Sequence, residues 1–106
     1  MPKFVIAYHG GKQPETPEAG KAHMQKYGAW LESLGGAALE PTVPLGSTHL
    51  VDRSGVRKAG HDERMSGYTV VEAEHLDAAL AIARRCPFLE IDGTLEVAQV
   101  MSMGCN

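Results

Sequence analysis

Two short segments rich in β-forming residues place the strongest constraint on the fold of this chain. They are KFVIAY at residues 3–8 and YTVV at residues 68–71, and each is apolar at both alternating sets of positions. A strand that is apolar on both faces is typical of the centre of a sheet, where both faces are covered. The sequence therefore predicts a sheet built around these two strands.

Each of these segments is followed by a predicted helix. Thr16-Pro17-Glu18 is a typical helix start, because it combines a capping hydroxyl, a proline suited to the first turn and an acidic side chain near the positive end of the helix dipole. Gly35-Gly36 ends this helix. A second helix is predicted to follow His75 in the capping position and to stop at Cys86-Pro87. The apolar positions that recur at helical spacing are Met24, Tyr27, Leu31 and Leu34 in the first helix and Leu76, Ala79, Leu80, Ala83 and Cys86 in the second.

Two further strands complete the pattern. We predict the second strand at residues 47–52, with a turn at Ser54-Gly55, and the last strand at residues 94–101; residues 56–65 form a polar loop left unassigned. The order strand, helix, strand, strand, helix, strand predicts an α+β, ferredoxin-like fold in which two helices cover one face of a four-stranded antiparallel sheet. Residues 1–106 are expected to form one domain. The other sheet face is also apolar, which predicts a homodimer that stacks sheet to sheet.

Charge and hydropathy exclude two classes of partner. The chain has 10 Lys and Arg against 13 Asp and Glu, a net charge of −3, and Arg84-Arg85 is its longest basic run, so no nucleic-acid surface is expected. No stretch approaches the roughly 20 apolar residues of a membrane helix, and the N-terminus lacks a signal-peptide pattern, which predicts no membrane partner and a cytoplasmic protein. Cys86 and Cys105 are then expected to be reduced.

Several motifs resemble the YCII-related domain family. They are SGYTVVEA at residues 66–73, HLDAAL at 75–80, RCP at 85–87 and GTLEV at 93–97. The opening strand, the tryptophan-bearing helix that ends in LGG at residues 34–36 and PTVPLG at 41–46 resemble members of the same family.

The resemblance implies a dimeric α/β barrel with a cleft in each protomer. The family includes a dehydrochlorinase acting on a chlorinated hydroxyhydroquinone, and a His–Asp pair is proposed as its active site. The resemblance therefore also implies a His–Asp pair. The family's histidine falls at or near His23, whereas its aspartate has no clear counterpart here. Another branch carries Asp-Gly-Pro-Phe before the third strand, where this chain has AGHDER at residues 59–64.

His23 is the first candidate catalytic residue. Helical spacing places it on the buried side of the first helix or at its edge, beside Tyr27 and Trp30. It is either a general base or a core or interface histidine hydrogen-bonded to backbone. Asp62, and after it Asp52, is the carboxylate expected to pair with it.

The remaining candidates concern binding. Tyr8, Tyr27, Trp30 and Tyr68 are predicted to share one apolar region between the first helix and the sheet, as core or as a pocket for a flat small molecule. The other candidate substrate-binding residues are His9, at the end of the first strand, and His61. The five histidines show no i, i+4 pair and no Cys-x-x-Cys companion, so we expect no metal and no cofactor.

Two function classes stay open from the sequence. One is a cofactor-free lyase or isomerase with a histidine base, and the other is a non-catalytic dimeric module that binds a small molecule or a protein.

Overall fold

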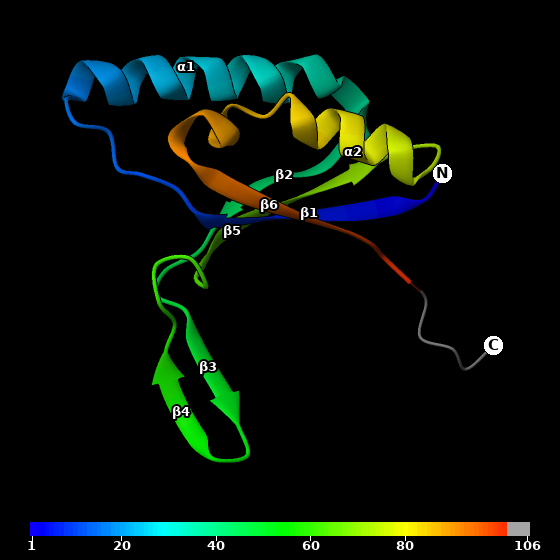
Figure 1. Ribbon diagram of the computed structural model, residues 1–106. Helices are drawn as coiled ribbons and strands as arrows, with labels where there is room; N and C mark the ends of the chain where they lie inside the picture. The colour runs from blue at the N-terminus through cyan, green and yellow to red at the C-terminus, as the bar shows by residue number, and fades with distance from the viewer. Residues whose placement is uncertain (102–106) are drawn as a thin grey trace.

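The computed structural model describes residues 1–101 and shows two helices over one face of an antiparallel sheet (Figure 1). The sheet contains β1 (Lys3–Gly10), β2 (Ala38–Pro44), β5 (Met65–Glu72) and β6 (Gly93–Gln99) in the order β2-β5-β1-β6. The helices are α1 (Pro17–Leu34) and α2 (Leu76–Arg84), and two short 3-10 helices, Gly35–Ala37 and Pro87–Ile91, follow them. The fold is ferredoxin-like, as predicted, with β1 and β5 at the centre of the sheet.

Both helix starts form as the sequence indicates. The Thr16 hydroxyl accepts a hydrogen bond from the Ala19 amide at 3.0 Å, and Pro17 occupies the first turn of α1. The His75 Nδ1 accepts from the Ala78 amide at 3.1 Å at the start of α2. These caps satisfy amide groups that the helix itself leaves unpaired.

The core lies between the helices and the sheet. Phe4, Ile6 and Val71 are fully buried beneath the helices. Because alternate residues of a strand point to opposite faces, Val5 and Ala7 of β1 lie on the helix-free face. Three residues of the predicted helical stripes are exposed rather than buried: Met24, Leu76 and Leu80.

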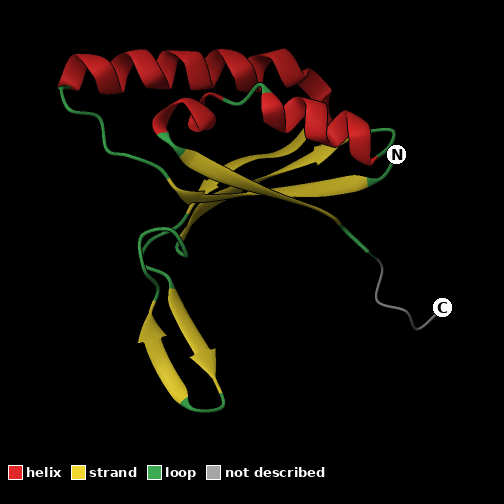
Figure 2. Ribbon diagram, in the orientation of Figure 1, coloured by secondary structure: helices red, strands yellow, loops and turns green. Residues whose placement is uncertain are grey.

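The strand predicted at residues 47–52 forms at His49–Asp52, but its predicted place as the second strand of the main sheet is wrong. The second strand of the sheet is β2, and residues 49–52 instead form β3 (His49–Asp52), which pairs with β4 (Gly55–Lys58) in a separate hairpin. Figure 2 shows this hairpin projecting away from the helices. The sequence obscured β2 because Pro41 and Pro44 interrupt it; both are tolerated because β2 is an edge strand with register irregularities.

The hairpin is fixed at its base and at its tip. The Thr48 hydroxyl accepts from the Met65 amide at 3.0 Å, so the base is tied to the start of β5. At the tip, one Asp52 carboxylate oxygen accepts from the amide and the hydroxyl of Ser54. The hairpin turn is therefore Arg53-Ser54, one residue before the predicted Ser54-Gly55, and residues 56–58, part of the loop left unassigned, belong to β4.

No helix within residues 1–101 is long and apolar enough to cross a membrane. The cytoplasmic location stays a prediction. Cys86 is a free thiol, whereas Cys105 lies outside the described residues.

Candidate functional site

Helix α1 and the loop after β1 border two adjoining cavities. The larger has a volume of about 320 Å³ and is lined by Gly10, Arg64 and Ser66 among others. The smaller, of about 190 Å³, is lined by Tyr8, His23, Met24, Tyr27, Thr42 and Phe88. His23, Met24 and Phe88 line both, so we call the two cavities together the His23 cleft.

Two glycines position the Phe88 wall of the cleft. Gly11 has φ +88°, and a Cβ atom added there would lie 2.9 Å from the Phe88 ring. At Gly93 the same atom would lie 2.2 Å from that ring. Glycine at both positions therefore lets the ring pack tightly, and it lies 5.3 Å from the Tyr8 ring between centroids.

His23 lies at the edge of the buried face of α1. Its ring stacks on Tyr27 with centroids 6.5 Å apart and an interplanar angle of 28°. Within residues 1–101 its side chain forms no hydrogen bond or ion pair with another protein group. The imidazole is thus half-buried at the cleft, and no group of the described residues engages its nitrogen atoms.

Four hydroxyl groups form a closed ring beneath the smaller cavity. The Tyr8 hydroxyl bonds with those of Tyr27, at 2.6 Å, and Thr69. Thr42 closes the ring, because its hydroxyl bonds with Tyr27 and, at 3.2 Å, with Thr69. Each hydroxyl can donate one bond and accept one, so all four are satisfied. Burial raises the pKa of Tyr8 well above its ordinary value, which keeps its phenol protonated.

The structure separates the two candidate aspartates. Asp62 lies beside the larger cavity: its Oδ1 is 3.5 Å from the position a Cβ atom would take at Gly10. Asp52 lies at the hairpin tip, where Ser54 occupies its carboxylate. His61 is exposed in the turn that also holds Asp62. Within residues 1–101 no ion pair joins His23 to either aspartate. The pairing stays a prediction.

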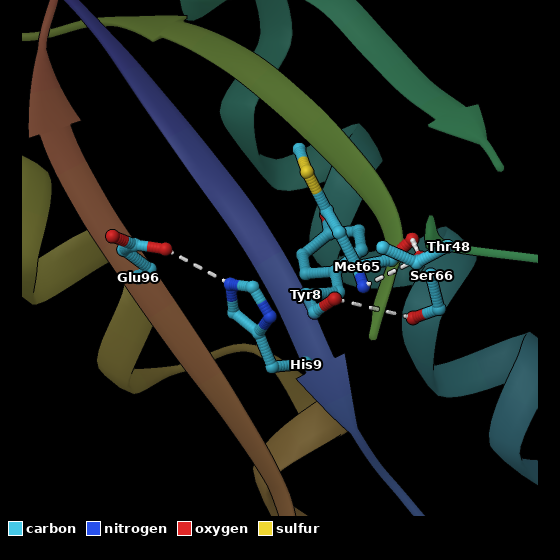
Figure 3. Close-up of polar contacts among 6 residues, drawn as sticks. All are labelled: Tyr8, His9, Thr48, Met65, Ser66 and Glu96. Carbon is cyan, nitrogen blue, oxygen red and sulfur yellow. Dashed lines mark hydrogen bonds and ion pairs between the residues drawn. The ribbon is translucent and has the colours of Figure 1, made fainter. Parts of the chain in front are cut away.

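A histidine–carboxylate pair does exist elsewhere, on the helix-free face of the sheet. The Nε2 of His9 lies 2.9 Å from Oε1 of Glu96, across from β1 to β6 (Figure 3). His9 alternates with Tyr8, which faces the helices, so its side chain points away from the His23 cleft. The same view shows the Ser66 hydroxyl donating to the Tyr8 carbonyl at 3.4 Å.

The predicted aromatic region is only partly correct. Tyr8 and Tyr27 line the cleft, and Trp30 lies beside them in the core, as predicted, with its indole nitrogen donating to the Ile82 carbonyl at 3.0 Å. Tyr68 pairs with Ala7 and therefore lies on the helix-free face. Its predicted place beside α1 is wrong because strand alternation reverses its direction.

Other parts of the described structure offer less chemistry. A cavity of about 350 Å³ between α2 and β6 is lined mainly by apolar side chains, with Arg84 its one charged residue. Burial raises the pKa of the Cys86 thiol to about 11, so it is a poor nucleophile at neutral pH. Within residues 1–101 no three His, Cys, Asp or Glu side chains gather into a metal site.

Three residues that shape the cleft were not among the candidates selected from the sequence. Arg64 stood in the unassigned loop, Phe88 followed a helix-ending proline, and Thr42 stood between two prolines. The one available signal was a lone arginine directly before the strand that contains Tyr68. Its importance depends on the loop after β1, more than 50 residues away in the sequence.

Comparison with known proteins identifies the family. The family model of the YCII-related domain matches residues 3–104, nearly the whole chain. This chain therefore belongs to the YCII-related domain family. A search of curated proteins finds no significant match.

Proposed function

We propose that this YCII-related protein is a cofactor-free enzyme of the lyase or isomerase type, with His23 as the general base. The observation that carries the proposal is the position of the His23 ring, which borders both cavities while no protein group within residues 1–101 engages its nitrogens. Imidazole exchanges protons near neutral pH, so a free ring nitrogen in a cleft suits proton abstraction from a bound molecule.

Asp62 is the carboxylate that we propose to assist His23. It lies in the loop that precedes β5 and contacts the Gly10 side of the larger cavity, which His23 also lines. Catalytic hydrogen bonds are often longer in a free enzyme than in its complexes, so we expect this carboxylate to pair with the ring only when a ligand is bound.

A non-catalytic small-molecule-binding module is the second candidate. One observation favours it: no carboxylate within residues 1–101 hydrogen-bonds to His23. The two candidates differ in whether the bound molecule exchanges protons at all: the enzyme transfers them, and the binding module does not.

Hydrogen exchange between a bound carbon acid and D₂O distinguishes the two candidates. We would incubate phenylpyruvate, 4-hydroxyphenylpyruvate and phenylacetone with the protein and follow deuterium incorporation beside the carbonyl group by NMR. A general base typically contributes about 10²- to 10⁴-fold, so the protein should accelerate exchange and His23→Gln should abolish the acceleration. His49→Gln, in the exposed hairpin, is the matched control. Binding without accelerated exchange for every compound would support the module instead.

We also propose that the protein is a homodimer through the helix-free sheet face. Val5, Val70 and Tyr68 lie half-exposed on that face, and Ala7 lies between them. Apolar surface of this kind commonly marks an interface. Sedimentation at micromolar concentration should give a dimer, and Val70→Lys should give a monomer, whereas Glu32→Lys on the exposed side of α1 should not. A monomeric wild-type protein would refute this interface.

A further inference from the structure

Arg64 is a cationic side chain of the His23 cleft, and its side chain has no partner among residues 1–101. It directly precedes β5 and lines the larger cavity together with Ser66. Its Nε atom is buried and has no hydrogen-bond partner within residues 1–101. Its backbone is held in place, because the Arg64 amide donates to the Gly60 carbonyl at 3.0 Å.

The charges around this cavity leave Arg64 uncompensated. Lys12 also lines the cavity, but its Nζ lies 2.8 Å from Oδ2 of Asp92, which offsets its charge. No Asp or Glu is among the lining residues. Asp62 lies nearby on the Gly10 side, yet within residues 1–101 Arg64 takes part in no ion pair.

A guanidinium group stays protonated in proteins, so it needs acceptors wherever it is buried. A buried donor without an acceptor costs free energy, and a carboxylate supplies two oxygens that match the planar guanidinium fork. We infer that Arg64 binds the carboxylate of a small organic acid whose apolar part occupies the smaller cavity. This inference rests on the proposed function and specifies its substrate class.

The shape of the cleft defines the rest of the ligand. Phe88 and Met24 line both cavities and offer apolar surface between them. In the smaller cavity the hydroxyls of Tyr27 and Thr42 are already bonded to each other, so this end presents mainly ring and methyl groups to a ligand. His23 also lines both cavities. A carbon atom between the carboxylate and the apolar group would then lie beside the base.

Two matched ligands test the role of Arg64. Phenylpyruvate carries a carboxylate. Phenylacetone is a neutral ketone that has the same phenyl ring and the same CH₂ group beside the carbonyl, with a methyl group in place of the carboxylate. Calorimetry on the whole protein should show phenylpyruvate binding at least about 10-fold more tightly than phenylacetone, since charge-assisted bidentate pairs are among the strong hydrogen bonds. Arg64→Gln should remove that preference and leave the affinity for phenylacetone unchanged. Arg53→Gln, in the exposed hairpin turn, should change neither affinity.

Three results would overturn the inference: equal weakening of both ligands by Arg64→Gln, equal affinity of the wild type for both, or no saturable binding of phenylpyruvate at millimolar concentration. Failure of the proposed function is distinguishable. Tight, Arg64-dependent binding without proton exchange would retain the carboxylate site and exclude His23 as a base. Exchange of phenylacetone protons that depends on His23 but not on Arg64 would retain the base and exclude the carboxylate site.

Discussion

The ring of four hydroxyls beneath the cleft makes a quantitative prediction about folding stability. Tyr8→Phe removes two hydrogen bonds, to Thr69 and Tyr27, and Thr69→Val also removes two, to Tyr8 and Thr42. At about 1 kcal/mol net for each bond, each single variant should lower the free energy of unfolding by about 2 kcal/mol.

The double variants separate neighbours in the ring from residues opposite each other. Tyr8 and Thr69 share one bond, so their double variant loses three bonds and should cost about 3 kcal/mol, a coupling of about 1 kcal/mol. Tyr27 and Thr69 share none, so Tyr27→Phe with Thr69→Val loses all four bonds and should cost about 4 kcal/mol, with coupling near zero.

Urea unfolding followed by Trp30 fluorescence measures both cycles. Trp30 is the only tryptophan of the chain and is buried, so its emission reports loss of the core. All variants are compared at one protein concentration, because self-association would make the midpoint depend on concentration. Equal coupling in the two cycles, or none in either, would refute the ring.

Two further predictions concern packing and pH. Gly93→Ala would place a Cβ atom 2.2 Å from the Phe88 ring, and this overpacking should lower the free energy of unfolding by about 1–3 kcal/mol. Gly28→Ala is the control: nothing lies within 4 Å of its Cβ position, so it should stabilise α1 by about 0.5–1 kcal/mol. Chemical unfolding measures both changes, and an unchanged stability of Gly93→Ala would refute the packing of the cleft wall. Burial raises the pKa of Cys86 from 9.0 to about 11, so the unfolded chain loses this proton at lower pH than the folded one. The free energy of unfolding should therefore fall as the pH rises from 9 toward 11, and Cys86→Ala should reduce that fall. The same pH dependence in the variant would contradict this prediction.

Local patterns predicted the parts of the fold that local physics determines. Thr16 and His75 cap the helices because capping is decided within one turn, and residues 3–8 and 68–71 are central strands because their two apolar faces require cover. The edge strand β2 was missed because its prolines suit an edge but resemble a loop in the sequence.

The candidate site was less predictable because it depends on contacts between distant segments. Helical spacing placed His23 at the edge of the core, and the structure places it at the cleft. Nothing local could show that the Thr69 hydroxyl meets those of Tyr8 and Thr42, or that Arg64 would have no side-chain partner among residues 1–101. Alternation alone, applied once the strand register is known, places Tyr68 on the opposite face.

Methyl NMR of methionine-labelled protein tests most directly whether the His23 cleft is the binding site. Met24 lines both cavities of the cleft. Met65 and Met101 line neither cavity, so these two serve as internal controls. On titration with phenylpyruvate, the Met24 methyl resonance should shift saturably while those of Met65 and Met101 remain in place. A ligand that shifts Met65 or Met101 and leaves Met24 unchanged would show that the binding site lies elsewhere and would contradict this account.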